Sequence, residues 1–495
     1  MHFRKLSVAI GAAFLSLVAT NALAIGDGPI VQEHLDQAEI AAGNVPFDDI
    51  MRAGGHLFSA KFNLYDGQGR PATTGGGAPR VSGSAPLFIR TSAPEANSCA
   101  GCHNDPFVGA AGDIVANVFV LAQTLDPVTF SVSSEFSNER NTLGMHGGGP
   151  IEMLAREITA DLHMQRAQLQ DSVPLNESGS VDLVSKGISF GTLVINERGN
   201  LDFSAVTGID DDLVIKPFHQ KGVVISMREF SNNAMNHHHG MQAIERFGSD
   251  RTGTDDFDQD GVTDELTVGD ITAVTIWQAG LGTPGQVLPD DSAALRAVVR
   301  GERKFDQIGC ADCHIPQLKL AGRDFVEPNP YNPLGNLRTG ESPDYSFDMT
   351  TQGFAPRIEA TPDGGALVRA YTDFKRHNLC DEEIRHFCNE QVVQAGVATE
   401  LFLTRKLWDV GNSAPYGHRG DLGTITEAIE QHGGEARLSR DAFMALDQDG
   451  KDEVVEFLKS LQVLAAGTES LVVDAKGRPL NAEQVKALKV AAFKQ

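Results

Sequence analysis

The chain has 495 residues, enough for two or three domains that each bury a core. Against 41 Lys and Arg stand 66 Asp and Glu, and the net charge of −25 argues against binding to nucleic acid or to anionic membranes. Hydrophobic residues at 41% and charged residues at 22% are typical of a globular protein, and they exclude wholesale disorder, a collagen-like chain and a protein with many membrane spans.

Residues 1–24 have the order of a signal peptide. Arg4 and Lys5 precede an apolar run, Leu6 to Ala19, that is too short to span a membrane, and Ala22 to Ala24 form a small-x-small cleavage site. No cysteine follows the cleavage point until Cys99, which disfavours a lipid anchor. We therefore expect an exported, periplasmic protein that does not insert into the membrane after signal cleavage.

Four of the six cysteines lie in two copies of the pattern C-x-x-C-H. The copies are Cys99, Cys102 and His103, then Cys310, Cys313 and His314. This pattern attaches a c-type haem: the two thiols add across the vinyl groups, and the adjacent His binds the iron. A redox pair, a disulfide or a zinc site is the alternative for one copy alone, but two copies with His in an exported chain favour two covalent haems.

The other two cysteines are Cys380 and Cys388, eight residues apart. Export favours a structural disulfide, and a reactive thiol pair is the alternative.

The 211 residues between the haem motifs predict one haem per domain. The predicted class is mainly α, with two cytochrome c-like haem domains and a mixed α/β insertion. The domains are residues 25–290, with the insertion at about 165–270, then 291–462, and a C-terminal tail, 463–495. Helices are expected at 150–169, 224–247, 293–307 and 452–461, and short strands at 191–195 and 212–215.

The sixth iron ligand decides what a haem does, because an open position admits peroxide or oxygen. After His314 the histidine candidates are His377, His386, His418 and His432. His432 is favoured because Thr424 to Glu427 form a capping box and Ile425, Ala428, Ile429 and His432 share one helix face. The alternative for His432 is a helix-terminal histidine stabilised by the helix dipole.

Three other patterns are weaker. Glu152 lies near a helix start after a Gly-rich loop, and position alone favours a carboxylate stabilised by the helix dipole. His237 to His239 fan over ~200° of a helix, so they cannot chelate one ion together, although one of them is able to contact a haem. A possible calcium loop, matching the first half of the pattern but with Thr267 at its twelfth position, competes with a plain acidic turn. Its candidate ligands are Asp256, Asp258, Asp260 and Asp264.

Four longer blocks resemble the di-haem oxidoreductase family, whose members are described as peroxidases or thiol oxidoreductases. The blocks are residues 97–113, 150–157, 228–241 and 407–436. The family is related to bacterial di-haem cytochrome c peroxidases and to the di-haem enzyme that matures the tryptophan-derived quinone of methylamine dehydrogenase.

The resemblance implies roles for matching positions. Its relatives carry a Met or Tyr ligand of the second haem where this chain has His432. Pro150 to Met153 match the segment that carries a catalytic Glu, which makes Glu152 the preferred acid/base. The loop 415–420 resembles the one preceding the ligand helix, so His418 and Arg419 are expected at haem edges or propionates. A Trp between the haems would be Trp277 or Trp408.

These observations predict an exported di-haem oxidoreductase of peroxidase type. One haem would transfer electrons and the other would react with substrate, with peroxide and a small redox protein as partners. The alternatives are an electron carrier without catalysis, or an oxidase of a protein side chain or thiol.

Overall fold

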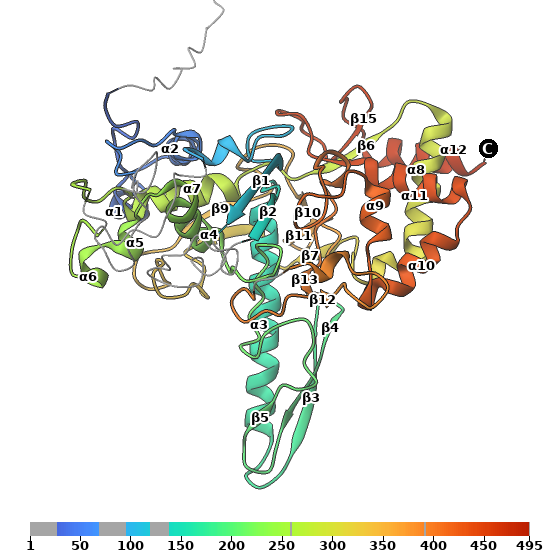
Figure 1. Ribbon diagram of the computed structural model, residues 1–495, viewed down its shortest axis with the longest axis horizontal. Helices are drawn as coiled ribbons and strands as arrows, with labels where there is room; N and C mark the ends of the chain where they lie inside the picture. Colours follow the sequence, from blue (N-terminus) through green and yellow to red (C-terminus); the bar gives the residue numbers. More distant parts are fainter. Residues whose placement is uncertain (1–26, 69–95, 119–137, 258–259, 391–392, 495) are drawn as a thin grey trace, which may run out of the picture.

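The computed structural model describes residues 27–68, 96–118, 138–257, 260–390 and 393–494 (Figure 1). The predicted signal peptide lies outside these residues. Within them, no helix has the length and apolar character needed to cross a membrane.

The prediction of a mainly α class is wrong. Helices make up 35% of the structure and strands 17%, and the described strands form several sheets of only two or three strands. These sheets are β1 (Gly112–Val118) with β2 (Asn138–Thr142), β3 (Gly179–Ser185) with β4 (Ile188–Ile195) and β5 (Leu201–Asp202), β6 (Gly285–Leu288) with β14 (Leu461–Gln462) and β15 (Val472–Asp474), β7 (Leu318–Leu320) with β10 (Glu359–Ala360) and β11 (Ala366–Val368), β8 (Asp324–Glu327) with β9 (Tyr345–Asp348), and β12 (Arg376–Asn378) with β13 (Leu401–Leu403). Some strands pair with a near neighbour in the chain, as β3 does with β4, whereas β6 pairs with β14 and β15 from the C-terminal part.

The first hydrophobic core is built around α7 (Val268–Ala279), which is buried along almost its whole length. Thr267 and Asp270 close a capping box at its start. Against it pack α1 (Gln37–Ala41), α2 (Phe47–Ser59) and α4 (Met227–Ala234). The short helices α5 (Ile244–Phe247) and α6 (Ser249–Thr252) lie in the same half of the molecule (Figure 1). The predicted helix at 224–247 is therefore broken: α4 passes into a π-helical turn, η2 (Met235–His239), that ends at the left-handed Gly240.

Helix α3 (Gly148–Ser172) extends away from the body together with β3, β4 and β5 (Figure 1). Its apolar face, Ile151, Leu154, Ile158 and Leu162, is buried as the sequence periodicity predicts. The β3–β4 hairpin turns at Lys186 and Gly187, which have φ of 50° and 82°, values typical of a two-residue type I′ turn. The predicted strand at 191–195 lies within β4, whereas residues 212–215 form no strand.

The second core joins α8 (Ser292–Gln307) and α11 (Gln448–Lys459). The two helices approach so closely that a Cβ at Gly301 would lie 1.8 Å from the Glu453 carbonyl oxygen. Helices α9 (Ile425–Glu430), α10 (Arg437–Ala445) and α12 (Ala482–Lys494) complete this half of the molecule. Helix α12 belongs to the predicted tail, and its Ala492 is buried in this core.

The two cores do not divide at one point of the chain. Residues from Leu318 to Phe374 follow the second motif but contribute side chains to the first core. The domain boundaries proposed from the sequence stay predictions.

Candidate functional site: a cavity shared by both C-x-x-C-H motifs

One cavity of about 540 Å³ reaches both motifs. Cys99, Cys102 and His103 line it together with Cys310, Cys313 and His314, although 211 residues separate the two copies. Segments 140–146, 217–220 and 402–407 also line it. Folding therefore brings both sets of haem-attachment residues to a single continuous space.

In the first motif, the ring of His103 is oriented so that one nitrogen is available to bind a metal. Cys99 begins a short 3-10 turn, η1 (Cys99–Gly101), that is capped by the Ser98 side chain. The Nδ1 atom of His103 lies 2.9 Å from the Leu143 carbonyl oxygen, which leaves Nε2 as the ligand atom. Burial, assisted by the charge of His238, lowers the pKa of His103 to about 4. The imidazole is therefore neutral at pH 7, as a metal ligand must be.

The second motif repeats this arrangement. Cys310 begins η3 (Cys310–Asp312), and Nδ1 of His314 lies 3.2 Å from the Tyr371 carbonyl oxygen. Tyr371 has a φ of 58°, which is rare for an aromatic residue and turns this carbonyl toward the histidine. Burial, assisted by His432, lowers the pKa of His314 to about 4. All four motif cysteines are outside disulfides, so both motifs fit covalently attached haem.

His432 lines the same cavity. The predicted capping box at Thr424 and Glu427 is present, but α9 ends at Glu430 and His432 follows its C-cap. Nδ1 of His432 lies 2.7 Å from the Ala428 carbonyl oxygen, so Nε2 is again the ligand atom. The axial role of His432 stays a prediction, and this geometry is compatible with it.

His418 also lines the cavity, next to the rings of Phe402 and Phe387 at 4.8 and 5.6 Å. Burial lowers the pKa of His418 to about 2, and neither of its ring nitrogens has a hydrogen-bond partner. A neutral, buried imidazole here fits a contact with a haem edge better than an ion pair with a propionate.

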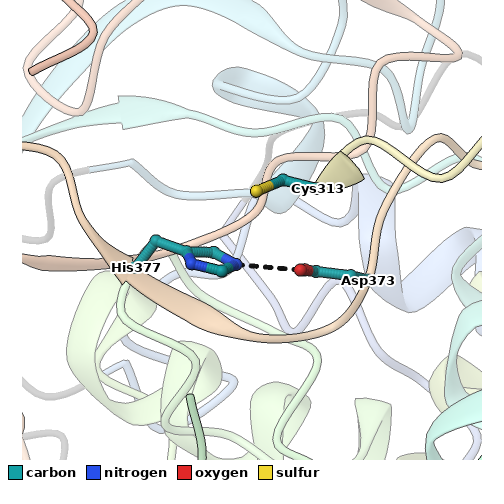
Figure 2. A group of neighbouring side chains, drawn as sticks. All are labelled: Cys313, Asp373 and His377. Carbon is teal, nitrogen blue, oxygen red and sulfur yellow. Dashed lines mark hydrogen bonds and ion pairs between the residues drawn. The ribbon is translucent and has the colours of Figure 1, made fainter. Parts of the chain in front are cut away.

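Cys313, Asp373 and His377 form a compact cluster beside the second motif (Figure 2). Their potential ligand atoms lie within 4.8 Å of one another. However, Nε2 of His377 lies 2.8 Å from Asp373 and Nδ1 lies 2.8 Å from Glu435. Against the effect of burial, the bond to Asp373 raises the pKa of His377 to about 11. His377 is therefore an imidazolium between two carboxylates and has no nitrogen left for a metal.

Glu152, the predicted acid/base, is fully buried on α3. One carboxylate oxygen pairs with Arg156 and accepts a bond of 2.8 Å from Asn329, and the other accepts 2.8 Å from the Met227 amide. Its neighbours Gly148 and Ile151 line the cavity, but Glu152 does not. The structure thus places this carboxylate in a buried ion-pair network beside the cavity wall, and the catalytic role stays a prediction without support from the geometry.

The two tryptophans lie in different places. Trp277 packs on Phe58, at 4.4 Å between ring centroids, and Phe58 lies 6.3 Å from His103. Trp408 is buried between the cavity-lining residues Leu407 and Asp409, and its ring occupies the space that a Cβ at Gly147 would need. Neither tryptophan lines the cavity itself, although Leu407 and Asp409 on either side of Trp408 do.

The remaining predicted residues lie away from the cavity. Cys380 and Cys388 are joined in a disulfide, with 5.3 Å between their Cα atoms. In the acidic loop, the Asp256 carboxylate accepts the amides of Asp260 and Gly261, both at 3.1 Å, while Asp258 lies outside the described residues. The calcium site stays a prediction.

Sequence reasoning missed the cavity histidine His219 and did not single out His238 from its run of three. His219 has a φ of 64° and stands alone in the sequence, so no pattern indicates it. His238 belongs to the run 237–239, which the sequence does not resolve into separate roles because a π-helical turn changes the faces its residues occupy.

Paired attachment cysteines, histidines with one free ligand atom and a common cavity define the site of a two-haem redox protein. The family described as "Di-haem oxidoreductase, putative peroxidase" matches residues 365–461, which confirms the resemblance over that range and supports the expectation of an enzyme. A comparison with curated proteins found no match.

Two solved structures show weaker similarity. Hydrazine synthase from Kuenenia stuttgartiensis is 13% identical, with 93% of this chain and 100% of that chain covered and a TM-score of 0.36. A MauG-like protein associated with microbial copper homeostasis is 15% identical, with 63% and 88% covered and a TM-score of 0.24. Neither similarity is strong enough to transfer architecture or activity.

Proposed function

We propose that this protein is an exported, periplasmic di-haem oxidoreductase that reduces peroxide. The observation that carries the proposal is the single cavity lined by both C-x-x-C-H motifs. An enzyme of this kind needs two redox centres that exchange electrons, and haems attached at both motifs would share this cavity. When bound, the haems supply two one-electron centres, and each is attached by the addition of two thiols across vinyl groups without a net change of oxidation state.

The chain gives the two centres different roles. In the second half, His314 and His432 each keep one imidazole nitrogen bonded to a carbonyl and the other available, which suits an electron-transfer haem with two strong ligands. In the first half, His103 supplies the proximal nitrogen for the centre that meets substrate. Trp408 is proposed to lie between the two centres.

The overall reaction is balanced by an external donor. Reduction of hydrogen peroxide breaks the O–O bond and consumes two electrons and two protons to give two waters. A small one-electron redox protein would deliver the electrons one at a time. Calcium at Asp256, Asp258, Asp260 and Asp264 is a further proposal, supported by the pattern of carboxylates in the sequence of this loop.

The test is the purified full-length protein. The intact mass measured under denaturing conditions should show two covalent haems. In a rapid-mixing experiment, one equivalent of peroxide should reoxidise the reduced protein. If the protein carries two haems that peroxide does not oxidise, the alternative of an electron carrier without catalysis is favoured. Oxidation of a protein thiol, with peroxide left unchanged, would favour the third alternative.

A further inference from the structure

The turn that follows His432 has no side chains of its own and packs closely against another loop. Gly433 and Gly434 come directly after the histidine, and Gly434 has a φ of 54°. A Cβ at Gly433 would lie 2.8 Å from the Ile384 carbonyl oxygen, and one at Gly434 would lie 2.3 Å from that of Asn378. A distant loop therefore touches the backbone immediately beyond His432, and glycine is needed for this approach.

Hydrogen bonds join the turn and this loop at the same place. The Gly433 amide donates to the Leu379 carbonyl oxygen at 3.1 Å. The Gly434 amide donates to Oδ2 of Asp381 at 2.9 Å. The turn after His432 is thus bound by one backbone carbonyl and one carboxylate of the same loop.

The same carboxylate also folds its own loop. Oδ1 of Asp381 accepts the amides of Glu383 and Ile384, at 2.9 and 2.8 Å. These bonds, led by the one from Ile384, hold the pKa of Asp381 well below its usual range, so the carboxylate is charged at neutral pH. The disulfide between Cys380 and Cys388 closes the loop around it. Asp381 therefore links a closed loop to the turn through charge-assisted hydrogen bonds.

The loop reaches the cavity as well. Leu379 lines it, and so does Phe387 of η4 (His386–Cys388). The ring of Phe387 lies edge-on to His432, with 6.0 Å between the ring centroids. The bond from Nδ1 of His432 to the Ala428 carbonyl fixes the imidazole only relative to α9, whereas the loop ties the end of α9 to the cavity wall.

We propose that Asp381 is a positioning residue for His432 as a ligand of the second haem. The inference rests on the proposed function for the presence of that haem and for ligation by His432. Asp381 lies outside the cavity lining and acts through the Gly434 amide, two residues beyond the histidine. Without this bond the turn moves more freely, and the imidazole leaves its ligating position more often.

The experiment uses the full-length protein with both haems attached, oxidised and without peroxide. The low-spin signal that disappears in His432→Ala identifies the second haem in electron paramagnetic resonance and optical spectra. Asp381→Ala should convert part of this signal to high spin. It should also speed cyanide binding to the same haem by about tenfold or more, the order expected when a hydrogen bond to a charged group is lost. Asp381→Asn keeps one acceptor oxygen and should have a smaller effect on both.

Glu383→Ala is the matched control. Asp381 and Glu383 both pair with Arg437, so each variant removes one charge and one partner of this arginine. Only Asp381 also binds the Gly434 amide through its side chain. Glu383→Ala should therefore keep the spectrum of the parent and its rate of cyanide binding. Haem content and Tm report the folding of each variant.

The proposal is overturned if Asp381→Ala, with both haems attached, matches Glu383→Ala in spectrum and in cyanide binding. If Asp381→Ala does not fold, the same comparison with Asp381→Asn decides. A His432→Ala variant with the spectrum of the parent would also overturn it, because His432 would then not be a ligand. Since ligation is read without peroxide, a protein inactive toward peroxide would refute the proposed function and leave the role of Asp381 intact.

Discussion

Both halves of the cavity present two cysteines and a histidine, and they differ in the elements that form the rest of the wall. In each, a short 3-10 turn presents two cysteines, and a carbonyl from a distant loop holds the proximal histidine. Two further cavity-lining histidines lie on different elements: His432 follows a capped α-helix, whereas His238 lies on a π-helical turn. A local motif therefore sets the cysteines and the first histidine of each half, while the rest of the cavity wall comes from elements that only the fold brings together.

The largest expected effect is loss of one haem from either half. Cys99→Ala with Cys102→Ala should leave one covalent haem, and Cys310→Ala with Cys313→Ala should leave the other, because each thiol pair attaches its own group. Intact mass under denaturing conditions measures the number directly. Two retained haems in either double variant would break the assignment of one haem to each motif.

Removal of His432 should change the second half alone. His432→Ala is expected to turn one low-spin signal into a high-spin one and to shift the reduction potential of that haem, since a strong axial ligand is lost. Optical spectra and potentiometric titration follow both effects. An unchanged spectrum would return His432 to the role of a helix-terminal histidine.

A substitution of Glu152, near the first motif, tests whether this residue has a catalytic or a structural role. As an acid/base it would contribute roughly 10²–10⁴-fold to turnover. Its burial among Arg156, Asn329 and the Met227 amide instead leads us to expect that Glu152→Gln lowers the free energy of unfolding by about 3–5 kcal/mol, as for a broken buried ion pair.

The control for Glu152 is Glu157→Gln, one to two turns further along α3, where the carboxylate pairs with Lys186 and is partly exposed. Thermal unfolding and peroxide turnover per folded molecule separate the two roles. A fall in turnover of the catalytic size, at unchanged stability, would restore Glu152 as the acid/base.

The disulfide belongs to the second half only. Cys380→Ala with Cys388→Ala should cost about 2–3 kcal/mol or less, because the closed loop is short, and should leave both haems in place. Chemical denaturation measures the free energy of unfolding, and intact mass measures the number of attached haems. If turnover disappears while unfolding is unchanged, the cysteines act as a reactive pair.

The smallest effect concerns pH. Burial lowers the pKa of His377, but the bond to Asp373 outweighs it and raises the value to about 11, against 6.5 in an unfolded chain. The ion pair thus stabilises the fold fully below about pH 6.5, and its contribution is lost as pH rises toward 11. The difference in unfolding free energy between the parent and His377→Gln should shrink over that range. A constant difference would show that His377 does not titrate with folding.

Much of the chemistry was predictable because it is encoded in neighbouring residues. The attachment motifs, the capping box of α9 and the apolar face of α3 follow from spacing along the chain. The fold class was predicted incorrectly because many short strands form in loops, where pairing partners decide the structure more than local propensity does.

By itself, the sequence determined which cysteines and histidines are candidates to attach and bind haem, since covalent attachment requires two thiols and a histidine at fixed spacing. The tertiary structure alone decided that both motifs share one cavity, that Glu152 pairs with Arg156 beside it, and that His238 lines the same cavity as His103. These relations join residues far apart in the chain, and they depend on packing between elements that no local pattern records.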